Sequence, residues 1–423
     1  MLETLRNSLR LPGLRNRLLF TVAMLVVLRI GAHIPVPGVN LEVLSALFGG
    51  GGFFDLIDVF AGGAFTNFAI FAMGVTPYIN ASIIMQLLTI VIPRLEEMQK
   101  EGEEGRKKIQ QFTRYGTVVL GLVQAFGLGY SLKANGAFYD SSWTTLFVIM
   151  VSLTAGTAFL MWLGEMITEK GIGNGISLII FANIITRLPY AIQEEAALLP
   201  TGQRNIFQLL LVAAIMLAMV VFVILITEGV RKIPVEYAKR VVGKRVYGGQ
   251  RTHLPMKINQ AGVIPLIFAQ SLLYFPITIA NFLPRNNSFY LWVNAYFQTN
   301  SIWFMVANAA LIIFFTYFYT AITFNPVDVA DNIKKNGGFI PGYRPGKPTA
   351  DYLDRISTRL TLVGGLFLAA VTIVPIYLIS LTGIEGAYLG GSSLLIVVSV
   401  ALETMKQIEA QLVMRHYQGF MRS

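Results

Sequence analysis

The side chains that most often carry catalysis or bind metals are sparse in this chain. It has no cysteine and only three histidines, His33, His253 and His416, which lie far apart and lack the spacing of a metal site. The glycine-rich run 171–175 resembles a nucleotide-binding loop, but it joins two apolar segments, and no Gly-Lys-Ser/Thr motif occurs. Because no nucleophile is paired with a base either, we predict that the chain is not an enzyme.

Ionisable side chains are also rare within the apolar segments. Arg29 and Arg187 are expected to extend toward the nearest membrane surface, whereas Glu403 and Lys406 can pair on one helix face. A proton- or sodium-coupled transporter keeps carboxylates near the membrane midplane. The apolar segments that contain proline offer aliphatic and amide groups there instead, which counts against such a transporter. A secondary transporter of a small solute with inverted repeats stays the alternative prediction, because repeated halves and broken helices also fit it.

Aliphatic side chains are the remaining candidates for a function. Val75 and Ile79 are four residues apart in one apolar segment, and Ile180 and Ile184 repeat this spacing in another. Residues four apart lie on one face of a helix. Such a stripe is typical of a packed core, and it also fits a hydrophobic constriction that excludes water and ions.

Two apolar segments contain nearly the same phrase. GVTPYINA begins at Gly74 and GVIPLIFA begins at Gly262, 188 residues later, and five of the eight positions are identical. Glycine and proline are costly inside a membrane-spanning helix. The pair therefore indicates a device repeated at the centre of a protein with two related halves, unless it is a coincidence between apolar sequences.

The elements that must position these residues are membrane-spanning helices. Hydrophobic residues make up 54% of the 423 residues, charged residues only 13%, and the mean hydropathy is +0.61. These values exclude an ordinary soluble domain and predict an all-α polytopic membrane protein. The predicted transmembrane helices are ten, at 18–34, 65–92, 115–132, 143–164, 175–192, 206–227, 259–283, 302–323, 360–382 and 391–413.

Lysine and arginine are distributed unevenly among the connections. Of the 33, 28 lie in one alternate set of connections, which includes both chain ends. The opposite set holds only Lys133, Arg187, Arg204 and Arg285. Because basic residues concentrate on the cytoplasmic side, both termini are predicted to be cytoplasmic. Ten spans divide into two sets of five, and the second set enters the membrane inverted because five is odd.

Three connections are more than ordinary loops. Residues 49–63 are too short to span, carry glycines at both ends and have apolar residues at helical spacing, so an interfacial helix and a mobile re-entrant element both fit. The basic connections 228–258 and 324–359 each fit a projecting hairpin that meets an acidic partner. The bias of basic residues toward the cytoplasm also explains their charge.

Several specific motifs follow one another along the chain. They are Ile34-Pro35-Val36-Pro37-Gly38, PYINASIIMQLL from Pro77, GEMITEKGIGNG from Gly164, Tyr237-Ala238-Lys239-Arg240, THLP from Thr252 and GYRPG ending at Gly346. By the order of these motifs, rather than by any single one, the chain resembles the SecY family, the channel subunits of the bacterial Sec protein translocase. The resemblance extends over essentially the whole length.

The resemblance implies two inverted five-helix halves, 1–192 and 206–423, around an hourglass pore, with an extracellular hinge connection at 193–205. The halves would open sideways between spans two and three and spans seven and eight. A short re-entrant plug helix at about 53–64 would close the extracellular side. The implied pore ring is Val75, Ile79, Ile180, Ile184, Ile267 and Ile396. The implied plug residues are Asp55, Leu56, Ile57, Asp58, Val59, Phe60, Ala61, Gly62, Gly63 and Ala64, and the lateral-gate residues are Gln86, Gln124 and Asn259.

The resemblance also implies a function. The chain would be a protein-conducting channel of the cytoplasmic membrane that passes unfolded secretory polypeptides and releases hydrophobic segments into lipid through a lateral gate. No cofactor is expected, and direction would come from partners because the chain has no motor motif. The implied partners are the small membrane subunits SecE and SecG, the SecA ATPase, the ribosome through its rRNA phosphates, signal peptides, secretory polypeptides and anionic lipids. The residues implied to dock SecA or the ribosome are Lys239, Arg240, Lys244, Arg245 and Arg344.

Overall fold

The computed structural model describes residues 11–48, 58, 61–134, 136–200, 205–237, 240–242, 245–247, 251–281, 287–297, 301–382 and 391–420. Each of the ten predicted spans contains a helix. The helices at the spans are α2 (Pro12–Gly31), α5 (Thr76–Val91), α7 (Glu103–Ala134), α8 (Trp143–Lys170), α9 (Gly175–Ala197), α10 (Ile206–Glu228), α11 (Ile264–Asn281), α13 (Ile302–Thr323), α15 (Lys347–Thr382) and α16 (Gly391–Phe420). The helices between them are α3 (Leu41–Phe48), α6 (Pro93–Lys100), α12 (Ser288–Tyr296) and α14 (Pro326–Lys335).

The described helices identify a multi-pass membrane protein. By length and hydropathy six of them can cross a membrane, or seven if α5 and α6, which are bent by 100° at their junction, form one broken span. Shorter apolar helices occupy Gly175–Tyr190 and Ile264–Ile277. The polytopic helical class is confirmed, and the count of ten spans stays a prediction.

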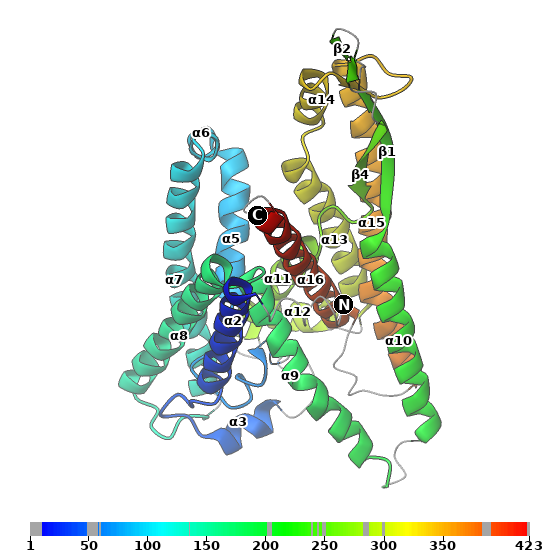
Figure 1. The fold of residues 1–423 in the computed structure, drawn as a ribbon. Helices are drawn as coiled ribbons and strands as arrows, with labels where there is room; N and C mark the ends of the chain where they lie inside the picture. The colour runs from blue at the N-terminus through cyan, green and yellow to red at the C-terminus, as the bar shows by residue number, and fades with distance from the viewer. Residues whose placement is uncertain are drawn as a thin grey trace.

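The helices at the spans gather in two groups. Helices α2, α5, α7, α8 and α9 pack against one another, and α10, α11, α13, α15 and α16 form the second group. The groups meet where α5 contacts α11 and where α9 contacts α16 (Figure 1). These two contacts place helices from distant parts of the sequence side by side at the centre of the molecule.

Helix α10 shows why the spans need a membrane. It is apolar on every face and begins at a capping box, in which the side chains of Asn205 and Gln208 each bond a backbone amide of the first turn. Its apolar side chains are largely exposed, for example Leu217 at 67% and Leu225 at 65%. A helix that buries so little of its apolar surface against the protein is stable only if lipid or another chain covers it.

The repeated phrase starts two helices rather than interrupting them. Helix α5 begins at Thr76 and α11 at Ile264, so the two prolines are the second helical residues, where a missing N–H removes no hydrogen bond. Two residues before each start, Gly74 and Gly262 have φ of 58° and 65°. The expectation of glycine and proline in mid-helix is therefore wrong, because both act as a helix start.

The two large basic connections form one small folded unit. In 228–258, β1 (Val230–Tyr237) pairs antiparallel with β4 (Arg251–Lys257), and β2 (Arg240–Val242) pairs with β3 (Arg245–Tyr247). The predicted hairpin is confirmed there. Connection 324–359 is not a hairpin, because it holds α14, the start of α15 and the short strand β5 (Gly338–Phe339), which pairs with β1. Side chains of both connections share a core that includes Ile233, Met256, Ile333 and Leu353.

Candidate pore and plug site

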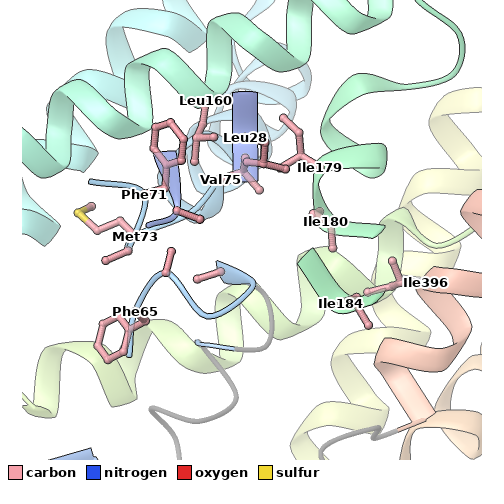
Figure 2. Packing of buried hydrophobic residues seen from close by; sticks show 14 of the residues in the cluster. Leu28, Phe65, Phe71, Met73, Val75, Leu160, Ile179, Ile180, Ile184 and Ile396 are labelled. Carbon is pink, nitrogen blue, oxygen red and sulfur yellow. The ribbon is translucent and has the colours of Figure 1, made fainter. Parts of the chain in front are cut away.

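The six predicted ring residues come from both helix groups. Val75 caps α5, Ile79 lies in α5, Ile180 and Ile184 lie in α9, Ile267 lies in α11 and Ile396 lies in α16. Four of them are buried in one continuous apolar cluster, and the half-buried Ile79 and Ile267 pack against it. Figure 2 shows Ile184 next to Ile396, at the contact between α9 and α16. The structure thus brings all six into the core where the two helix groups meet.

The repeated phrase places its isoleucines equivalently. Ile79 and Ile267 are each the fourth residue of their helix, and their backbone amides bond to the carbonyl oxygens of Val75 and Val263 at 3.0 Å and 3.2 Å. Helices α5 and α11 contact each other, and both isoleucines pack against the same apolar cluster. The glycine and proline therefore determine where each helix begins, and so where its isoleucine lies.

We use the name plug segment for the described residues 58 and 61–64. The predicted plug residues Asp55, Leu56, Ile57, Val59 and Phe60 lie outside the described residues. Within the segment, Ala61 and Ala64 are buried in the same apolar cluster as the ring residues. The segment therefore packs on the core that holds the predicted ring residues.

Asp58 organises the plug segment and the turn that follows it. Its side chain is only 2% exposed. It accepts hydrogen bonds from the backbone amides of Phe65 and Thr66, both at 2.9 Å, and from the Thr66 hydroxyl at 2.5 Å. A buried carboxylate with three such donors is well solvated by its own segment.

Two arginines of neighbouring helices bond the plug segment. Arg187 of α9 forms an ion pair with Asp58. The Arg29 guanidinium of α2 donates to the carbonyl oxygen of Gly62 at 2.7 Å and to the Thr186 hydroxyl at 3.2 Å. The expectation that both arginines extend to the membrane surface is wrong, because each finds a partner inside the protein.

Gly62 allows the segment to approach α9 closely. It has φ of +67°, and a side-chain carbon built on it would lie 2.7 Å from the Asn183 Oδ1 atom and 3.0 Å from the Asn183 Cα atom. Ile180, Ile184 and Arg187 follow one another at spacings of four and three residues, so they share a face of α9. This face carries ring residues and, one turn further along, the arginine that bonds the plug segment.

The predicted gate residues are not bonded to one another. The Gln86 side chain of α5 donates to the Ser82 hydroxyl at 3.3 Å, and the buried Asn259 side chain donates to the carbonyl oxygen of Gly262 at 3.1 Å. Gln124 lies half-buried on α7, which packs beside α5. Asn259 thus supports the turn that begins α11, a role that sequence reasoning did not anticipate.

The predicted docking residues lie in the unit formed by the two basic connections. Arg240 and Arg245 belong to the paired strands β2 and β3, and Arg344 is an exposed residue after β5. Lys239 and Lys244 lie outside the described residues. The three described positions are all on loops or strands beyond the helical spans (Figure 1).

Known proteins match this chain over most or all of its length. The model of the SecY family matches residues 69–405. A protein translocase subunit SecY from Halalkalibacterium halodurans is 50% identical over 100% of both chains. The chain belongs to the SecY family.

Solved structures show that the fold is shared beyond close relatives. A SecY protein whose plug domain stabilises the closed state of its translocation channel covers 94% of this chain and 92% of its own, with a TM-score of 0.68 and 20% identity. Sec61 in the canine ribosome–channel complex from the endoplasmic reticulum covers 94% and 93%, with a TM-score of 0.64 and 19% identity. The predicted family and the helical channel fold are confirmed, whereas the count of ten spans and the plug helix stay predictions.

Knowledge of the SecY family pattern alone did not reveal the arginine contacts of the plug segment. In the sequence Arg29 and Arg187 are isolated charges, and the family pattern identifies Asp58 only as a plug residue. The sequence does contain a signal, because charged residues within or beside the apolar segments are few. A charge in such a place requires a partner, and a carboxylate in the nearest short connection is the natural one.

Proposed function

We propose that the chain is a protein-conducting channel that passes unfolded secretory polypeptides across the cytoplasmic membrane and releases hydrophobic segments into lipid. The observation that carries this proposal is the gathering of six aliphatic residues from both helix groups in one core, with the plug segment packed on it. Membership in a family of translocase subunits and the shared fold support it. None of these relatives supports the alternative, a transporter of a small solute.

An aliphatic ring suits the passage of a polypeptide. Flexible apolar side chains contact any sequence without offering strong hydrogen bonds, and a narrow apolar collar excludes water and ions by dewetting. Val75, Ile180, Ile184 and Ile396 are buried, which corresponds to a closed ring in this conformation. The ring would open only as far as the polypeptide requires and would close again behind it.

Release into lipid would take place between α5 and α11. These helices belong to different groups and contact each other directly, so separating the groups opens a path from the ring to the membrane. A hydrophobic segment gains free energy by entering lipid, whereas a charged residue costs about 2.5 to 3.5 kcal/mol at the membrane centre. Gln86, Gln124 and Asn259 are proposed to set the polarity that an exiting segment meets.

Cross-linking to a stalled substrate tests the pore. The chain has no cysteine, so single cysteines at Ile79 and Ile267 can be paired with a cysteine in a secretory polypeptide halted during translocation. A cysteine at Leu217, which is 67% exposed on α10, is the matched control. We expect disulfides from Ile79 and Ile267 and none from Leu217. If the two ring positions fail to cross-link, the pore does not pass between these helices.

The driving force would come from partners that dock on the cytoplasmic unit. Arg240, Arg245 and Arg344 belong to it, and Lys239 and Lys244 are sequence neighbours of the first two. These basic side chains would contact rRNA phosphates or an acidic face of the SecA ATPase. A ribosome-bound Sec61 complex among the structural relatives supports the ribosome as a partner. Such contacts weaken as salt concentration rises, so docking that is insensitive to salt would contradict this assignment.

The remaining architecture is proposed from the same pattern. Ten spans in two inverted halves, 1–192 and 206–423, would be joined by the hinge 193–205, with both termini in the cytoplasm. The two helix groups and their contacts support that division. The exposed apolar faces, above all that of α10, would be covered by lipid, including anionic lipid, and by the small subunits SecE and SecG.

A further inference from the structure

Among the described residues, two arginines on other helices bond the plug segment. They are Arg187 of α9 and Arg29 of α2, and these two helices pack together. Both helices belong to the first group, and neither is the helix that faces α11. A movement that separates α5 from α11 therefore leaves these anchors and the plug segment together.

The ion pair is built so that it can be broken and formed again. Asp58 accepts three hydrogen bonds from Phe65 and Thr66, which are part of the same stretch of chain. When the plug segment leaves α9 together with Phe65 and Thr66, the carboxylate keeps these donors and loses only Arg187. The Arg187 side chain is 28% exposed although its Nε atom is buried, so water can reach part of the guanidinium after separation. This lowers the cost of breaking the pair, which is largest when a charge is left fully buried without a partner.

The second arginine bonds to backbone rather than to a charge. Arg29 holds the Gly62 carbonyl oxygen and, through the Thr186 hydroxyl, is tied to α9. Gly62 meets Asn183 so closely that a side chain at this position has no room. The two arginines thus bond the segment at two positions, 58 and 62.

We infer that Arg29 and Arg187 are the residues that hold the plug on the first helix group, and that release of the plug and separation of α5 from α11 are two distinct steps. This inference rests on the proposed channel function. It assigns the retention of the plug to two side chains. It predicts that removing their contacts with the plug segment frees the plug and leaves α5 and α11 in contact.

Cysteine accessibility measures plug release directly. Ala64 is fully buried in the plug segment, and Ala64→Cys would be the single cysteine of the chain. The purified protein in nanodiscs is labelled with a membrane-impermeant maleimide. We expect Arg187→Gln and Arg29→Gln each to raise the labelling rate about tenfold. This corresponds to a loss of about 1.4 kcal/mol in the free energy that favours the docked plug over the released plug. Lys133→Gln, which removes a cation that lies over the Trp143 ring, is the matched control and should change nothing.

A double-mutant cycle separates a specific pair from general damage. Asp58→Asn removes the charge and keeps an oxygen that can accept from the backbone amides of Phe65 and Thr66. In the Arg187→Gln background, Asp58→Asn should raise the labelling rate by a smaller factor than it does in the parent protein. Single and double variants that elute as monodisperse protein are compared, which removes unfolded material. If Arg187→Gln labels no faster than Lys133→Gln, or if the factors of the two changes simply multiply, Arg187 does not hold the plug through Asp58.

A distance measurement tests whether the two steps are distinct. Spin labels on cysteines at Ile90 of α5 and Leu272 of α11, both about half exposed, report the separation of the helices. Arg187→Gln should leave this distance distribution unchanged. If the distance between the spin labels shifts together with faster labelling at position 64, plug release and helix separation are one coupled step. That result would overturn the inference of two distinct steps. Neither readout requires translocation, so a failure here is distinguishable from failure of the substrate cross-linking that tests the channel itself.

Discussion

The burial of Ile184 should keep the resting channel closed to ions. This side chain is fully buried at the contact between α9 and α16. When the ring opens around a polypeptide, the side chain faces a passage rather than a packed core. Its burial therefore favours the closed state over the open state, and replacing it should shift that balance.

The size of the shift follows from two terms. Burying an isoleucine side chain is worth about 1.5 to 3 kcal/mol, and Ile184→Asn gives this up. The new amide is left without partners in an apolar cluster, which costs about 1 to 3 kcal/mol more in the closed state. A total of about 2.5 to 6 kcal/mol raises the open population by roughly 10² to 10⁴. Ile184→Val removes one methylene and should raise it only about fivefold.

Ion conductance in planar bilayers measures this population without any substrate. We expect frequent openings for Ile184→Asn, intermediate behaviour for Ile184→Ala, and nearly silent channels for Ile184→Val. Ile192→Asn is the matched control, because Ile192 lies on the same helix but is 57% exposed. Equal conductance for Ile184→Asn and Ile192→Asn would refute the argument that burial of the ring seals the channel.

Three further perturbations probe other parts of the molecule. Gly62→Ala and Gly63→Ala both strain a residue with positive φ, but only the new methyl group at position 62 would meet Asn183. In the Ala64→Cys background, Gly62→Ala should therefore be labelled several-fold faster than Gly63→Ala. Equal labelling rates would argue against the close contact with Asn183. Arg344→Ala should weaken SecA or ribosome binding several-fold at low salt and flatten its salt dependence, measured by co-sedimentation; an unchanged salt slope would exclude this residue from docking. Glu165→Gln breaks the ion pair with Arg114, whose closest atoms are 2.9 Å apart, and should lower Tm by about 2 °C in a thermal-shift assay. Glu96→Gln, which breaks the exposed pair with Lys100, should leave Tm unchanged.

The repeated phrase shows how far a sequence pattern reaches. Five shared positions indicated a device used twice, and the structure places both copies at equivalent helix starts. The position of those starts was not predicted, since an apolar run continues through both glycines without a change in hydropathy. A helix start depends on whether the preceding backbone turns, and the left-handed φ of Gly74 and Gly262 permits that turn without requiring it.

The two basic connections show the same limit in another form. Their charge and length predicted projections toward a partner, and one of them does contain a hairpin. That they pack into a single unit with a shared core depends on β5 reaching β1 across about a hundred residues. Local composition carries no record of such a long-range pairing.

The sequence by itself determined that this is a polytopic helical membrane protein of the SecY family, because span length, hydropathy and motif order are properties read along the chain. Only the tertiary structure decided that Arg187 reaches Asp58, 129 positions away, and that Arg29 reaches Gly62. Each arginine seen alone is a charge beside an apolar segment, with the membrane surface as its nearest solvent. Its partner is settled by the packing of α2 and α9 around one short turn, because the distance between side chains on separate helices is set by packing and not by local sequence.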